Sequence, residues 1–131
     1  MVVVAWVSRH KPLPAQISEL KKRLGNDARI IKFSKIFKNA EEVYREIRSF
    51  GARYAVVVLP LSMISVLTAQ YKDVVWLWSE MEVLHRNCKG THCPEYNPDT
   101  DVILESFSEV RHFRFRGFKR ILKVEMVAEP W

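Results

Sequence analysis

Four short apolar runs, separated by stretches of helical periodicity, constrain the fold of this chain more than any other feature. The runs cover residues 1–7, 29–33, 54–59 and 74–78, and they are rich in β-branched and aromatic side chains. Continuous runs of this kind are typical of strands buried on both faces of a parallel sheet. The alternating residues 79–84 are compatible with an extension of the fourth strand.

Three amphipathic segments separate these runs. The first covers residues 13–24, the second begins with a capping box at Asn39 and Glu42, and the third covers residues 62–71. Strands that alternate with helices at this spacing predict right-handed βαβ units. The expected fold class is α/β, as a small Rossmann-like or flavodoxin-like three-layer sandwich with a mostly parallel sheet and a C-terminal β-hairpin.

The length of 131 residues predicts a single domain, residues 1–131. Within it we expect a βαβαβαβ core over 1–84, a loop with cysteine and histidine over 85–101, and a C-terminal segment over 102–131 with a basic hairpin. The longest apolar runs fall far short of the ~20 residues of a membrane-spanning helix. Because basic residues follow the first apolar run, as they do not in a signal peptide, we expect a cytoplasmic protein without a membrane partner.

Three short motifs resemble a group of small uncharacterised Rossmann-like proteins of archaea, their viruses and phages. They are Trp6-Val7-Ser8-Arg9-His10, Val58-Leu59-Pro60-Leu61 and Phe115-Arg116-Gly117-Phe118-Lys119-Arg120. The resemblance covers about residues 1–84 and 113–128 and leaves the cysteine loop outside. It implies a Rossmann-like fold, and no established activity comes with it.

The first candidate site lies where the first strand ends. Ser8, Arg9 and His10 follow that strand directly, and Ser62 begins the third helix. Ligands of open parallel sheets bind outside the carboxyl ends of the strands, and an arginine beside a helix N-terminus favours phosphate. These residues therefore predict a nucleotide site, with His10 as a candidate acid or base. The alternative is a solvated loop in which Ser62 is only a cap, since no glycine-rich phosphate loop occurs.

The net charge of +6 is concentrated near the C-terminus. Residues 110–124 hold six basic side chains and no acidic one: Arg111, Arg114, Arg116, Lys119, Arg120 and Lys123. Such a field attracts polyanions, which makes nucleic acid a candidate partner. The arginines alternate with Phe113 and Phe115, and Gly117 marks a turn or bulge, as in an edge hairpin. A solvated face or an interface with an acidic partner would show the same pattern.

The loop holds four side chains that bind zinc in other proteins: His85, Cys88, His92 and Cys93. Their number matches tetrahedral zinc, although the spacing is not that of a common finger or ribbon. Cys88 and Cys93 are alternatively a disulfide pair or free thiols. A metal at this place would be structural rather than catalytic.

Three function hypotheses from different classes remain open. The leading one is binding of a phosphate-bearing ligand, either a nucleotide at the strand ends or nucleic acid at the basic hairpin. The second is a phosphodiester-acting enzyme for nucleic acid or a cyclic nucleotide, with His10 as acid or base. The third is a structural module that forms a homo-oligomer through its sheet edge or aromatic surface.

Overall fold

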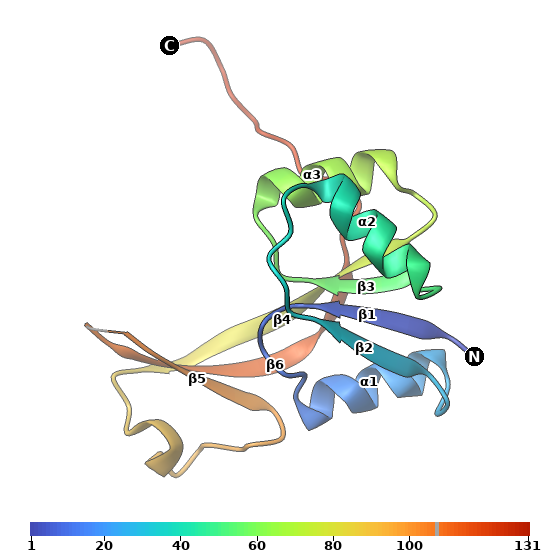
Figure 1. Ribbon diagram of the computed structural model, residues 1–131. Coiled ribbons are helices and arrows are strands. Elements are labelled where there is room, and N and C mark those ends of the chain that lie inside the picture. Colours follow the sequence, from blue (N-terminus) through green and yellow to red (C-terminus); the bar gives the residue numbers. More distant parts are fainter. Residues whose placement is uncertain (107) are drawn as a thin grey trace.

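A computed structural model describes residues 1–106 and 108–131, which form one six-stranded sheet with three α-helices (Figure 1). The strands are β1 (Val3–Val7), β2 (Arg29–Phe33), β3 (Tyr54–Val57), β4 (Val75–Arg86), β5 (Asp101–Glu105) and β6 (Val110–Arg120). The helices are α1 (Pro14–Leu24), α2 (Ala40–Ser49), α3 (Leu61–Gln70) and the short 3-10 helix η1 (Gly90–His92). The strand order is β2-β1-β3-β4-β6-β5. Neighbours among the first four strands pair parallel, and β6 pairs antiparallel with both β4 and β5.

The predicted α/β class is confirmed, but the sheet is mixed instead of mostly parallel. β4 has 12 residues and pairs with β3 only as far as Leu77, so its outer part has β6 as its partner. After β4 the loop over residues 87–100, which contains η1, leads to β5 at the edge of the sheet, and β6 then returns between β4 and β5. β6 therefore pairs antiparallel with both of its neighbours, and the sheet curls away from its parallel part (Figure 1).

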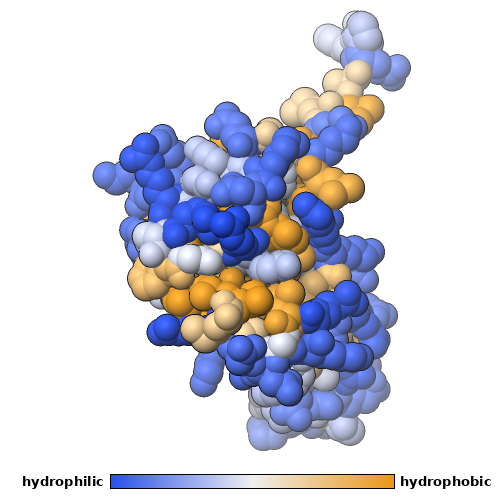
Figure 2. All heavy atoms as spheres, turned by 90° about the vertical axis from the view of Figure 1, so that its right-hand side faces the viewer, coloured by the Kyte–Doolittle hydropathy of each residue, from blue (hydrophilic) through white to orange (hydrophobic). Residues whose placement is uncertain are grey.

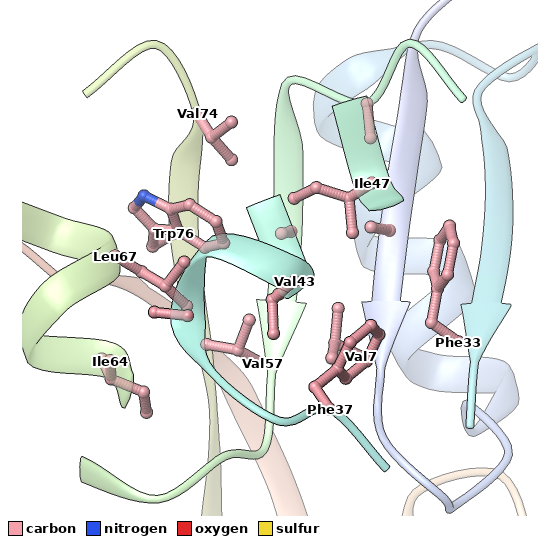
Figure 3. Close-up of a cluster of buried hydrophobic side chains, with 14 residues drawn as sticks. Val7, Phe33, Phe37, Val43, Ile47, Val57, Ile64, Leu67, Val74 and Trp76 are labelled. Carbon is pink, nitrogen blue, oxygen red and sulfur yellow. The ribbon is translucent and has the colours of Figure 1, made fainter. Parts of the chain in front are cut away.

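Helices cover both faces of the parallel part. α1 lies on one face and α2 and α3 lie on the other (Figure 1). The larger apolar cluster lies under α2 and α3 and includes Val43, Ile47, Leu67 and Trp76 (Figure 3). A smaller cluster around Leu20 of α1 packs on the opposite face. Figure 2 shows the apolar layer as a band with hydrophilic side chains above and below it.

Of the two predictions for Gly117, a turn or a bulge, the bulge is confirmed, whereas a hairpin that turns at this glycine is wrong. β6 runs unbroken through that glycine, which has φ +138° and lies opposite Glu80, while Phe115 lies opposite Met81. Arg116 is therefore the extra residue of a β-bulge, and the glycine supplies a backbone conformation that other residues rarely adopt. The hairpin that does form joins β5 to β6, and the Ser106 amide donates to the Glu109 carbonyl at its end.

We divide the molecule into two regions. The body comprises residues 1–78 and 118–124, whose last segment packs Ile121 and Val124 against the larger apolar cluster. The extension comprises residues 79–106 and 108–117, which form the outer halves of β4 and β6 together with β5 and η1. Residues 125–131 project away from the body (Figures 1 and 2). None of the helices in the described chain has the length and apolarity that crossing a bilayer would require.

Candidate functional site

A hollow of about 260 Å³ lies at the carboxyl ends of β1, β2 and β3. Ser8 and Arg9 line it from the end of β1, Val58 and Leu59 line it from the end of β3, and residues 33–37 close it from the β2 side. This is the edge at which parallel sheets bind ligands. The sequence had predicted a site here, and the structure brings two of the four predicted residues to it.

A second hollow, of about 570 Å³, adjoins the first because both are lined by Val58 and Leu59. Leu61 and Ile64 of α3 form one wall, and Trp78 of β4 forms another. Trp78 is 59% exposed, although Trp76 on the same strand face is buried. We call the two hollows together the edge groove, which runs from Arg9 to Trp78.

The charges along the edge groove differ between its ends. Lys35 is shared between Glu42 and Glu46, at 3.4 and 3.2 Å. Arg9 is exposed, and no carboxylate of the described residues lies within ion-pair distance of it. At the other end, Lys119 pairs with Glu80 at 2.6 Å. Arg9 is therefore the cation best placed for an anion in the groove.

His10 and Ser62 do not line either hollow. The His10 amide donates to Ser8 Oγ at 3.1 Å, and the His10 carbonyl accepts from the Trp6 indole at 2.8 Å. The backbone at His10 thus holds the β1 end in shape, while its imidazole is exposed. Ser62 is also exposed and makes no capping hydrogen bond, because α3 begins one residue earlier with Pro60 at its N-cap.

The six basic residues of the predicted polyanion site lie on or just after β6, and five of them pair with a carboxylate. The pairs are Arg111–Glu109, Arg114–Asp101, Arg116–Glu82, Lys119–Glu80 and Lys123–Glu125. Among the described residues Arg120 alone of the six has no such pair. Neighbouring strands therefore supply much of the negative charge that is absent from residues 110–124 themselves.

In the extension, three side chains that can hold a metal ion lie together: His85, Cys93 and His112. One ligand atom from each lies within 4.8 Å of the other two. They come from β4, from the end of η1 and from β6, so the fold joins distant parts of the chain. Two of the four predicted ligands are in this group, whereas Cys88 and His92 are outside it. Cys88 and Cys93 are free thiols, not a disulfide.

Asp101 holds His112 in place from the opposite side of the ring. Asp101 Oδ2 lies 2.7 Å from His112 Nε2, and the Arg114 guanidinium donates to both carboxylate oxygens, at 2.8 and 3.0 Å. Burial raises the pKa of the Asp101 carboxyl, but the hydrogen bonds from Arg114, Thr100, the Asn97 amide and His112 outweigh burial and hold that pKa well below its usual range. Asp101 is therefore a charged acceptor, and it favours a proton on His112 Nε2.

Sequence reasoning missed His112 and Asp101. His112 shares its strand face with Arg114 and Arg116, and the sequence pattern predicted a polyanion-binding face there, with a solvated face as the alternative. The available signal was a histidine in the C-terminal segment that follows a loop with two cysteines. Comparison with protein-family models, with curated proteins and with solved structures finds no match for this chain. Statements about its function therefore rest on the edge groove and on the His85–Cys93–His112 group.

Proposed function

We propose that this protein binds a nucleotide or a similar small ligand in the edge groove. The observation that carries the proposal is the groove itself, at the carboxyl ends of parallel strands. It joins Arg9, which pairs with no carboxylate of the described residues, to the exposed Trp78. A ligand with phosphate at one end and an aromatic base at the other matches these two ends.

The walls of the groove support a ligand with an apolar or aromatic part. Val58 and Leu61 are 61% and 63% exposed, so large apolar side chains lie open along its length. Small-molecule sites are typically apolar hollows with a few polar groups that fix the orientation of the ligand. Ser8 and Arg9 are the polar groups that fit this role, because both line the hollow at the β1 end.

The other hypotheses have less support. Five of the six basic residues on and after β6 are ion-paired, which weakens the field that a nucleic acid would meet. We assign His10 no role in a phosphodiester reaction, because it does not line the groove. Homo-oligomer formation stays a prediction from the sequence.

The direct test is calorimetric titration with AMP, ATP and cyclic AMP at moderate salt. One of these is expected to bind, and Arg9→Ala is expected to weaken it by about 10- to 100-fold, the loss typical of a hydrogen bond to a charged group. Trp78→Ala is expected to weaken it at least about fivefold, as for loss of one base-stacking contact.

Lys11→Ala is the matched control for Arg9→Ala. Lys11 is exposed, lies two residues further along the chain and does not line the groove, so its loss should leave affinity unchanged. Absence of binding by all three nucleotides would contradict the proposal. Equal affinity in the wild type, Arg9→Ala and Trp78→Ala would show that a nucleotide binds elsewhere.

A further inference from the structure

The interior of the extension is polar. Neither apolar cluster contains a residue from 79–106 or 108–117. The most buried side chains there are those of Asp101 and His112, which are both 0% exposed. A small region without an apolar core commonly depends on a metal ion or a disulfide for its stability, and the two cysteines here are not joined.

Two buried nitrogens in this interior have no hydrogen-bond partner among residues 1–106 and 108–131: His85 Nε2 and His112 Nδ1. The Glu95 carboxylate lies 3.2 Å from His85 Nε2, but the two groups are not aligned as a hydrogen bond. Buried polar atoms in native proteins are nearly always satisfied, so a pair of orphaned ring nitrogens needs an explanation. A metal ion bound to both nitrogens supplies one.

The spacing of the three side chains suits one ion. Ligands of a tetrahedral zinc lie about 3.3–3.7 Å from one another, given the usual zinc–nitrogen and zinc–sulfur bond lengths. The ligand atoms of His85, Cys93 and His112 are already within 4.8 Å of one another, so a small closure brings them to that spacing. One thiolate with two imidazoles is a donor set that selects zinc over magnesium or calcium.

Asp101 supplies the outer contact that metal-bound histidines usually make. Because its carboxylate lies 2.7 Å from His112 Nε2, the proton is favoured on that nitrogen and the lone pair on Nδ1. His112 Nδ1 is the orphaned atom, and His112 belongs to the cluster with His85 and Cys93. The tautomer that Asp101 selects is thus the one that can bind a metal.

We propose that His85, Cys93 and His112 bind a structural zinc ion, with Glu95 as the fourth ligand. The ion joins β4, the loop after η1 and β6, and it takes the place of an apolar core in the extension. Glu95 is chosen because its carboxylate is already beside His85 Nε2. None of the four side chains lines the edge groove, so this inference does not depend on the proposed function.

The test begins with protein stripped of metal by a chelator and titrated with zinc against a chromogenic competitor. One zinc per chain is expected, and cobalt in its place should show the absorption of a thiolate–cobalt bond. Loss of an outer contact alone lowers zinc affinity by about 10–100-fold, so Cys93→Ser and His112→Ala should exceed that loss. Cys93→Ser should also abolish the thiolate–cobalt band.

Cys88 and His92 provide matched controls, since they lie in the same loop but outside the cluster. Cys88→Ser and His92→Ala should keep the zinc stoichiometry, the zinc affinity and the cobalt band. Because Cys93 is only half-buried, Cys93→Ser should fold even if His112→Ala does not. Comparing the zinc affinity of Cys93→Ser with that of Cys88→Ser therefore still tests the proposal.

Failure of the wild type to bind one zinc, or equal zinc affinity in Cys93→Ser and Cys88→Ser, would overturn the proposal. Glu95→Gln should lower zinc affinity while retaining the thiolate–cobalt band. An unchanged affinity in Glu95→Gln would overturn the assignment of the fourth ligand. Zinc binding and nucleotide binding are measured in separate titrations. Absence of a zinc site is therefore distinguishable from absence of nucleotide binding in the edge groove.

Discussion

In the body, most of the buried side chains are apolar, and Val4, Val43, Ile47 and Leu67 are fully buried. In the extension, the most buried side chains are those of Asp101 and His112, which are polar. The first kind of interior is stabilised by removal of apolar surface from water, which is non-directional and tolerates small rearrangements. The second kind depends on specific partners, and losing one partner leaves another buried group unsatisfied.

One continuous sheet is thus stabilised by apolar burial in the body and by specific polar contacts in the extension. β4 and β6 run through both regions, from Trp76 in the larger apolar cluster to His85 beside His112. Disruption of the body should therefore unfold the whole chain, whereas disruption of the extension should be local.

The largest effect is expected from Ile47→Ala in the body. The side chain is fully buried between α2 and the sheet, and its truncation should lower the free energy of unfolding by about 3–4 kcal/mol. Denaturant titration followed by circular dichroism measures the loss. The same loss is expected with and without zinc, and a cost below about 1 kcal/mol would contradict the account of the body.

Asp101→Asn should have a somewhat smaller effect, confined to the extension. It removes the charge that Arg114 and His112 contact, at a cost of about 2–3 kcal/mol, because Arg114 is 27% exposed and can be rehydrated. Zinc affinity should also fall about 10–100-fold. Local opening measured by hydrogen exchange should rise in β5 and outer β6. Asp99→Asn, at an exposed carboxylate nearby, is the control, and equal effects of the two variants would argue against a special role for Asp101.

Gly117→Ala should cost about 1–2 kcal/mol through backbone strain alone. Its φ of +138° disfavours any residue with a Cβ, while an added methyl group would meet no atom within 4 Å. The strain lies at the bulge where the body meets the extension, so exchange should rise in the outer β4–β6 pairing before it rises in β1 or β3. A variant as stable as the wild type would show that the bulge relaxes without cost.

The smallest effect on stability is expected from Trp78→Ala, within about 0.5 kcal/mol, because this side chain is largely exposed. Trp76→Ala, two residues earlier on the same strand face, should cost about 3–5 kcal/mol, since Trp76 is buried. Thermal unfolding of the two variants gives the comparison. A large loss from Trp78→Ala would mean that this tryptophan supports the fold and is not kept for a ligand.

Much of the body could be predicted from the sequence, and much of the extension could not. The four apolar runs and the Asn39 cap predicted β1 to β4 and the start of α2, because burial on both faces leaves a local pattern. The contact of Asp101 with His112 and the pair of Arg116 with Glu82 join different strands, and no local periodicity reports such partners. Gly117 suggested a turn or a bulge, and the sequence could not choose between them because a glycine with positive φ serves both equally.

The central claim is that an apolar core stabilises the body and a zinc ion stabilises the extension. Hydrogen exchange of the full chain, measured with zinc and again after chelation, tests it most directly. The account predicts that chelation accelerates exchange across β5 and the outer parts of β4 and β6, while β1 and β3 keep their protection. Unchanged exchange in the extension, or equal acceleration in both regions, would contradict it.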